Sequence, residues 1–392
     1  MSQPSRFEMI LLALLLVASA GAFWRRLGGV LHRIRTAKPD VGFSIQPIGR
    51  RVLDLVSEVA LQAKVIRERP LAGLAHALVF WGFCAFALVT LNHIATGFGY
   101  AFLNGWAGDV YALFAAGFAI AVSFSIAGLF VRRFVLRPRW LGEQLSYESG
   151  VIALLILTLM FTYLFPLWFP EYAKPLWWAH TLALLAFLPL VPHTKHLHLV
   201  LSPFSVFFSR GGFAHIPPLS GDEDFGLDTG KDVTRIAALQ AYSCVECGRC
   251  TEHCPAYNTG KTLNPKEIAL GFRGYLNEFG PASQEPLLGK HLSQEAAFQC
   301  TTCGACEFQC PVGVEHLPLI VGLRRGAVKH RQVGGRLRHQ VVSRAGAERQ
   351  RAGNERSRAR QVYRTRTISE VRLHAGVLLV AGLYGLLRSA GP

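Results

Sequence analysis

Residues 244–255 read C-V-E-C-G-R-C-T-E-H-C-P, and residues 300–311 repeat the same cysteine spacing as C-T-T-C-G-A-C-E-F-Q-C-P. Cysteines in a C-x2-C-x2-C-x3-C-P run bind [4Fe–4S] clusters, three to one cluster and the fourth to the neighbouring cluster. One cluster is therefore predicted to bind Cys244, Cys247, Cys250 and Cys310. The other is predicted to bind Cys300, Cys303, Cys306 and Cys254.

Two other uses of cysteine fit these runs less well. Structural zinc sites use pairs of cysteines, and disulfides need an oxidising compartment. A glycine follows the second cysteine of each run, at Gly248 and Gly304, where a tight loop often needs a positive φ angle. The remaining cysteine, Cys84, lies in an apolar stretch and is predicted to be a small core residue.

The first half of the chain is apolar enough to cross a membrane several times. The sequence of 392 residues is 51% hydrophobic, with a mean hydropathy of +0.28. A helix needs about 20 apolar residues to span a bilayer. The first apolar stretch could instead be a signal peptide, but it lacks a basic start and a clear cleavage site. We predict membrane spans at 8–24, 72–96, 109–131, 150–169 and 176–200.

Charge in the connecting segments predicts the direction of these spans. Ten Lys and Arg residues separate the first two spans and four separate the third and fourth, whereas the second connection has none and the fourth has only Lys174. Basic connections stay in the cytoplasm. The N-terminus is then outside the inner (plasma) membrane, and the cysteine runs lie in the reducing cytosol, which suits cluster-bound thiolates.

Histidines near both ends of two spans predict metal ligands, since ionisable side chains inside a bilayer are costly. His76 and His93 lie at the two ends of the second span, and His180 and His198 at those of the fifth. Seventeen or eighteen residues of helix rise about 26–27 Å, almost the hydrocarbon thickness. Because the two spans run antiparallel, His76 lies level with His198, and His93 with His180. This pattern predicts two bis-histidine haem b groups.

His196 is an alternative to His198 as a ligand. His180 and His198 are five helical turns apart and so share a helix face, which favours His198. Pro189 and Pro192 could kink the helix and spoil this phase. The competing interpretation is that these histidines bond to backbone or lipid headgroups. His193 and His196 stay either such interfacial residues or candidates for a quinone site.

Composition divides the chain into four parts. Residues 1–201 form the predicted membrane domain, 202–232 a linker rich in Gly, Pro, Ser and Asp, 233–330 a helical ferredoxin-type domain with two [4Fe–4S] clusters, and 331–392 a disordered basic tail. The predicted fold class is mainly α. Within the third part, a helix is expected around 265–277, which opens on a proline.

The basic tail supplies most of the formal charge of +16. It holds thirteen Arg and three Glu but neither Lys nor Asp, so it contributes +10. No basic patch is interleaved with aromatic residues, and nucleic-acid binding is therefore not expected.

Three motifs carry a resemblance to a known family: C-V-E-C-G-R-C-T-E-H-C-P-A-Y-N-T-G-K-T-L-N-P-K at 244–266, C-T-T-C-G-A-C-E-F-Q-C-P-V-G-V-E-H at 300–316 and K-H-L-H at 195–198. Residues 5–330 resemble the heterodisulfide-reductase-related iron–sulfur membrane proteins, whose N-terminal domain is like the gamma subunit of respiratory nitrate reductase. Some of these are electron-transfer-flavoprotein:menaquinone oxidoreductases. The resemblance implies two haem b, two [4Fe–4S] clusters, a menaquinone site at the membrane and a cytosolic flavoprotein or other redox subunit as donor.

That family continues into cysteine-rich CCG domains, whereas this chain has no cysteine after Cys310. We expect the tail from about residue 345 to be read out of frame, ahead of those domains. Residues 376–392 can be back-translated into codons that, read one base later, encode E-Y-C-L-W-L-G-C-M-G-S-Y-D-P-Q-G, which resembles the opening of a CCG domain. The alternative is a genuine disordered tail with a short apolar segment. The nucleotide sequence of the gene tests this expectation, and codons that cannot encode the shifted peptide would contradict it.

These features predict a membrane-bound oxidoreductase that passes electrons between a cytosolic donor, such as electron-transfer flavoprotein, and menaquinone. One alternative is a subunit that reduces heterodisulfides or thiols, but that chemistry needs the CCG cysteines. The other is a non-catalytic membrane anchor that relays electrons for a separate catalytic subunit. No catalytic side chain is predicted.

Overall fold

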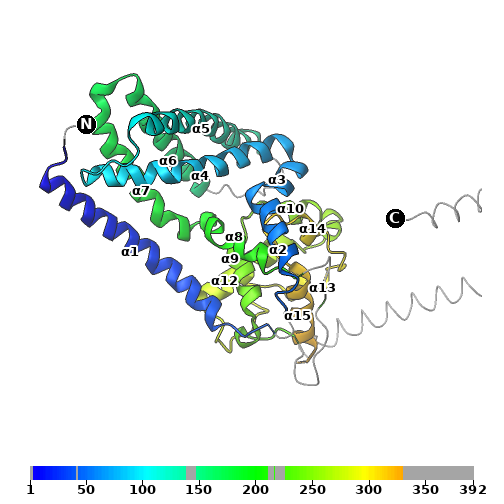
Figure 1. Cartoon of the computed structure of the whole chain (residues 1–392). Helices are drawn as coiled ribbons and strands as arrows, with labels where there is room; N and C mark the ends of the chain where they lie inside the picture. The colour runs from blue at the N-terminus through cyan, green and yellow to red at the C-terminus, as the bar shows by residue number, and fades with distance from the viewer. Residues whose placement is uncertain (1–2, 41–42, 138–146, 211–215, 217–225, 330–392) are drawn as a thin grey trace, which may run out of the picture. The chain divides into compact units, whose positions relative to one another are not determined.

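The computed structural model describes residues 3–40, 43–137, 147–210, 216 and 226–329 (Figure 1). These residues form helices joined by loops. Some of the loops pair through isolated β-bridges, for example between Lys38 and Thr234. The predicted mainly α class is confirmed. The predicted tail at 331–392 and residues 211–215 and 217–225 of the predicted linker lie outside the described residues.

Five long apolar helices make up the first half of the chain, which confirms the number of predicted spans among the described residues. The 28 residues of α4 extend about 42 Å, more than the ~30 Å hydrocarbon layer. The five helices are α1 (Arg6–Thr36), α4 (Pro70–Gly97), α5 (Gly105–Val131), α6 (Tyr147–Leu164) and α7 (Ala173–His193). Short turns extend or precede them: η2 (Arg132–Leu136), η4 (Phe165–Leu167) and η5 (Pro170–Tyr172).

Small residues let the membrane helices pack closely. A Cβ atom at Gly82 of α4 would lie only 2.4 Å from Cγ2 of Val122 on α5. Ala115 and Ala119 of α5 are fully buried in the same apolar cluster, together with Met160 of α6. Small residues at such contacts bring helix backbones together, which is how helices associate in lipid. Cys84 is exposed on α4, so the prediction that it is a core residue is wrong.

The fifth apolar helix ends earlier than predicted. Helix α7 stops at His193, and Thr194 adopts an extended conformation whose side chain accepts a hydrogen bond from the His196 amide. Two further helices follow, η6 (Lys195–Leu197) and α8 (His198–Phe207), and α8 occupies the start of the predicted linker. The prediction that His180 and His198 share one helix face is therefore wrong, because the chain turns between them.

Part of the first connection packs beneath the helix bundle. It forms α2 (Ile48–Asp54), η1 (Leu55–Ala60) and α3 (Ala63–Glu68). Arg51 of α2 is buried, and its guanidinium donates hydrogen bonds to the carbonyls of Phe207 and Ser209, both at 2.6 Å. Since the last carbonyls of a helix lack partners within it, Arg51 caps the end of α8.

The cysteine runs lie in a compact group of short helices. Phe272, Tyr275 and Leu276 of α12 are buried in its core, which also includes Val30 of α1 and Leu201 of α8. The predicted helix from residue 265 is confirmed as α12, capped by the Asn264 side chain. The helices of this region are η7 (Gly230–Asp232), α9 (Arg235–Ser243), α10 (Arg249–Glu252), α11 (Pro255–Asn258), α12 (Pro265–Glu278), α13 (Gln294–Phe298), α14 (Ala305–Gln309) and α15 (His316–Lys329).

Polar contacts attach this region to the end of α1 and to α8. Lys38 exchanges backbone hydrogen bonds with Val233 and Arg235, both at 2.9 Å. Arg210, just after α8, forms ion pairs with Asp40 at 2.8 Å and Glu315 at 2.7 Å. The cysteine runs are thereby held at a defined position against one end of the membrane helices.

Candidate metal centres

The two cysteine runs fold into matching loops. Gly248 and Gly304 have φ angles of 77° and 74°, which confirms the predicted need for glycine. Glu246 and Thr302, at equivalent positions of the two loops, also have positive φ angles, of 58° and 55°. Non-glycine residues rarely adopt this conformation, and such strain gathers at functional sites. The same strained conformation recurs in both loops, at the point where each run would wrap around its cluster.

The fourth cysteine of each run lies near cysteines of the other run. Burial, followed by the charge of Cys247, raises the pKa of Cys310 to about 11. Burial also raises the pKa values of Cys300 and Cys306, and the charge of Cys254 adds to both shifts. The structure thus brings Cys310 near Cys247 of the first run and Cys254 near Cys300 and Cys306 of the second, while the ligand sets stay predictions.

The surroundings of the sulfurs suit an anionic iron–sulfur cluster. Burial raises the pKa of Cys244 to about 12, so a bound metal must displace its proton. The amide of Val314 donates to Cys310 Sγ at 3.3 Å, and that of Thr302 to Cys300 Sγ at 3.4 Å. Such donors stabilise the negative charge of ligating sulfurs.

Each cysteine loop is also held by one arginine from the helix that follows it. Arg273 of α12 donates to the carbonyl of Cys244 at 3.2 Å, and Arg324 of α15 donates to that of Cys300 at 2.5 Å. Within the described part of the chain, no three His, Cys, Asp or Glu side chains converge closely enough to hold a single metal ion. A four-iron cluster is wider than one ion, so its ligands stand farther apart.

A cavity of about 380 Å³ lies between the membrane helices and the first cysteine run, and His76, His196, His198 and Cys247 all line it. The ring centroids of His76 and His198 are 6.5 Å apart. That distance leaves room for one metal atom bonded at about 2 Å to a nitrogen of each ring. His198 Nδ1 lies 2.8 Å from the carbonyl of Lys195, which orients the ring as ligating histidines are commonly oriented. His76 Nδ1 is buried without a partner. These residues fit a bis-histidine haem.

His196 lies beside His198, with ring centroids 6.1 Å apart. Its Nδ1 is 3.0 Å from Thr194 Oγ1, a contact within its own turn. Burial lowers the pKa of His196 to about 3, and burial also lowers that of His198. Both rings are therefore neutral at pH 7, the form that binds metals. The ring contact with His76 favours His198 as the ligand.

The second predicted pair also meets, but more tightly. The ring centroids of His93 and His180 are 4.7 Å apart. His93 Nε2 lies 2.8 Å from the Thr181 hydroxyl, and His180 Nδ1 lies 2.8 Å from the Thr162 hydroxyl. These rings touch each other, so they must part to admit a metal between them. The fit to a haem is thus closer at His76 and His198 than at this pair.

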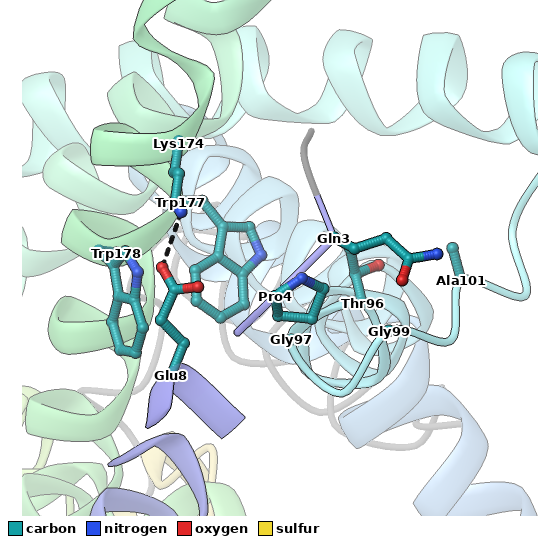
Figure 2. A pocket seen from close by; sticks show the side chains of 10 residues that line it. All are labelled: Gln3, Pro4, Glu8, Thr96, Gly97, Gly99, Ala101, Lys174, Trp177 and Trp178. Carbon is teal, nitrogen blue, oxygen red and sulfur yellow. Dashed lines mark ion pairs between the residues drawn. The ribbon is translucent and has the colours of Figure 1, made fainter. Parts of the chain in front are cut away.

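A smaller cavity, of about 130 Å³, opens between the start of α1, the end of α4 and the start of α7 (Figure 2). The Glu8 carboxylate and the Lys174 ammonium form an ion pair across it at 2.8 Å. The indole rings of Trp177 and Trp178 lie beside this pair. Trp177 stacks on His93 with ring centroids 4.7 Å apart, and its Nε1 is buried without a partner. From the sequence, Lys174 was only a loop charge, and this site was missed.

Residues 240–314 match the 4Fe–4S dicluster domain family. Because the match includes both runs of four cysteines, it implies two [4Fe–4S] clusters. The chain thus contains a 4Fe–4S dicluster domain, and its described residues include five candidate membrane-spanning helices.

Several of its relatives are named as oxidoreductases or reductases. The chain is 29% identical to the probable iron–sulfur-binding oxidoreductase FadF of Bacillus subtilis over 342 residues, which covers 67% of this chain and 48% of that protein. It is 28% identical to the EtfAB:quinone oxidoreductase of Syntrophomonas wolfei over 341 residues, which covers 68% and 47%. A shorter match, 31% over 114 residues, is to one subunit of the dihydromethanophenazine:CoB–CoM heterodisulfide reductase of Methanosarcina barkeri and covers 26% and 27%. The chain spans about half the length of the first two relatives. No solved structure matches it.

Proposed function

We propose that the chain transfers electrons between a cytosolic donor and menaquinone, using two [4Fe–4S] clusters and two haem b groups. The donor would be electron-transfer flavoprotein or another redox subunit on the cytoplasmic side. The relationship to an EtfAB:quinone oxidoreductase supports this choice of partners. The basic connections support an inner-membrane location with the N-terminus outside.

One observation carries the proposal: a cluster cysteine and a pair of haem-type histidines line the same cavity. Cys247 faces it from the first cysteine run, His76 from the membrane helix α4, and His198 from the start of α8 just after the last membrane helix. The ligands of a soluble carrier and those of a membrane carrier are therefore neighbours. When bound, the clusters and haems would supply the one-electron chemistry that protein side chains lack.

The protein's own residues would hold these carriers and influence which of their redox states is favoured. The amides at Thr302 and Val314 donate to sulfurs, and the guanidinium of Arg273 lies at the first cysteine loop. Positive groups near a cluster favour its reduced, more negative state. Arg324, at the second loop, has the same relation to its cluster.

The cavity of Figure 2 fits the ring of a quinone. A cavity of about 150 Å³ can hold one benzene ring, so about 130 Å³ has room for the quinone ring of menaquinone but not for its whole two-ring head. Trp177 Nε1 is an unpartnered donor for a quinone oxygen. The Glu8 carboxylate, held by Lys174, would accept the proton that a quinol loses on oxidation.

An assay with purified protein tests the proposed function. We expect a menaquinol analogue to reduce the bound haem, and reduced electron-transfer flavoprotein to reduce the quinone analogue when it is added. If quinol reduces the haem but flavoprotein has no effect, the result would support the alternative of a membrane anchor that relays electrons for a separate catalytic subunit. Reduction of a disulfide substrate in place of quinone would support the thiol-reductase alternative.

Replacing the carboxylate in the small cavity should slow quinol oxidation without loss of cofactor. For Glu8→Gln we expect a rate about 100-fold lower, because a positioned proton acceptor contributes a factor of ~10²–10⁴. The measurement is haem reduction by a menaquinol analogue in stopped flow. Glu171→Gln is the matched control, because Glu171 is exposed in η5 just before α7. An unchanged rate in Glu8→Gln, or an equal loss in the control, would place quinol elsewhere.

A further inference from the structure

The short helix α3 lies between α4, the membrane helix that carries His76, and the loops that contain the cysteines (Figure 1). It has only six residues, Ala63–Glu68. An isolated helix shorter than about 12 residues is marginal in water, so contacts with the rest of the protein must hold α3 in place. Those contacts run in two directions, toward the membrane helices and toward the first cysteine run.

On the membrane side, α3 packs directly against Gly73, which lies one turn before His76 on α4. A Cβ atom at Gly73 would lie 2.3 Å from the Val65 carbonyl oxygen and 2.6 Å from Ile66 Cα. Both are backbone atoms, which cannot rotate away as the end of a side chain can. Glycine, which has no Cβ, therefore lets α3 approach α4 this closely.

On the other side, α3 contacts two loops that supply predicted ligands of the first cluster. Arg249 lies between Cys247 and Cys250, is buried, and donates a hydrogen bond to the Val65 carbonyl at 3.3 Å. The Lys64 ammonium donates to the carbonyl of Cys310 at 3.0 Å. The cysteine loops are thus attached to α3 by hydrogen bonds from charged groups, which are stronger than those between neutral groups.

The Val65 carbonyl joins the two directions. It lies against Gly73 and accepts the hydrogen bond from Arg249. Val65, Gly73 and Arg249 also line the cavity that His76 and Cys247 face. A displacement of α3 would therefore change the separation between the first cysteine run and the His76 helix.

We propose that α3 is a positioning element that sets the gap between the first cluster and the haem of His76 and His198, with Gly73 and Arg249 as its positioning residues. The inference rests on the proposed function, since it takes both carriers as bound. In the step concerned, one electron passes between the two carriers, so that one is oxidised as the other is reduced and no bond forms or breaks. The rate of such a step falls steeply as the gap widens.

The first test compares Gly73→Ala with Gly82→Ala in full-length protein purified with its cofactors. The methyl group at residue 73 must displace α3 by about 1 Å, since ordinary contacts lie at 3.4–4 Å. At residue 82 the same group meets side chains of α5, at Val122 and Phe118. A misplacement of about 1 Å can cost a factor of ~10² in rate, so we expect electron transfer between cluster and haem to slow at least tenfold in Gly73→Ala alone.

Two measurements follow this change. The rate is that of the haem-reduction phase that follows cluster reduction after flash photoreduction with a deazaflavin. The gap is followed by electron paramagnetic resonance after radiolytic reduction in frozen solution, because a ferric haem speeds the spin relaxation of a nearby reduced cluster. We expect this effect to weaken in Gly73→Ala. Neither substitution changes a charge, so the reduction potentials should stay at their wild-type values.

A second set of variants keeps the test decisive if Gly73→Ala loses a cofactor. Arg249→Met removes the hydrogen-bond donor and should slow the same step, whereas Arg249→Lys can still donate to the Val65 carbonyl and should recover most of the rate. Arg67→Gln is the control, because Arg67 is exposed on α3 and should leave the rate unchanged.

The outcomes separate this inference from a folding defect and from the proposed function. Wild-type rates in Gly73→Ala and Arg249→Met, with two haem b and about eight non-haem irons per chain, would overturn the inference alone. Equal slowing in Gly82→Ala would also overturn it, because a general loosening of the bundle would then be the cause. Slowing in Gly73→Ala with shifted potentials and unchanged spin relaxation would do the same. A wild-type chain without haem would overturn the proposed function as well.

Discussion

Replacing Cys310 with alanine should remove one [4Fe–4S] cluster and leave the other. Iron should fall from about eight to about four atoms per chain, because each cluster contains four. We further expect the lost cluster to be the one bound by the first cysteine run, since Cys310 lies near Cys247 of that run. Iron and acid-labile sulfide assays, with electron paramagnetic resonance of the reduced protein, measure the loss.

Double variants distinguish crossed from uncrossed ligation. Cys244→Ala/Cys310→Ala removes two ligands of one cluster and should retain about four irons. Cys300→Ala/Cys310→Ala removes a ligand from each cluster and should retain almost none. Cys84→Ala is the control, because Cys84 is exposed on α4, outside both cysteine runs, and should keep about eight. If the two double variants exchange these results, each run binds its own cluster and the crossed assignment is wrong.

Replacing His198 should remove one of two haem b groups, whereas replacing His196 should remove none. His198 faces His76 across the cavity with ring centroids 6.5 Å apart, and His196 bonds to Thr194 in its own turn. We expect the pyridine haemochrome absorbance of His198→Ala to be about half that of the wild type, since one haem of two is lost. His196→Ala is the matched control, because it removes an imidazole from the same cavity.

The pairing of histidines can be tested in the same way as that of the cysteines. His76→Ala/His198→Ala removes both ligands of one haem and should keep the other. His76→Ala/His180→Ala removes one ligand from each pair and should lose both. A haem that persists in His198→Ala but disappears in His196→Ala would exchange the roles of these two residues. Equal haem loss in every variant would indicate a folding defect, which the iron content would reveal.

Local sequence was sufficient for the cysteine loops but not for all their geometry. Gly248 and Gly304 were predictable, because only glycine adopts a positive φ angle without strain. Glu246 and Thr302 share that conformation, yet their residue types give no such signal. The loop imposes it on them. Spacing along the chain predicted that the two runs would fold alike, because they repeat one local pattern, whereas the crossed sharing of cysteines between clusters stays a prediction.

The histidine pairs were predictable from helix length, although the helical phase that favoured His198 was wrong. One continuous helix was expected from His180 to His198, whereas α7 ends at His193 and the chain turns at Thr194. The turn, and not the helix face, brings His198 toward His76. A helical period cannot describe a position that lies beyond the end of its helix.

Contacts between segments far apart in the sequence could not be predicted from the sequence alone. Arg51 counted as a cytoplasmic loop charge, but it caps α8 through carbonyls more than 150 positions away. Gly73 and Arg249 come from separate segments, and only the packed chain shows that they line one cavity. The same holds for Glu8 and Lys174, whose ion pair joins the first and last membrane helices.

The cofactor content of the purified wild-type protein tests the central claim most directly. A pyridine haemochrome spectrum with iron and acid-labile sulfide assays should give two haem b and about eight non-haem irons per chain, with as much sulfide as iron. A preparation without Soret absorption and with only trace iron would contradict the account, because the paired histidines and crossed cysteines would then bind nothing that carries an electron.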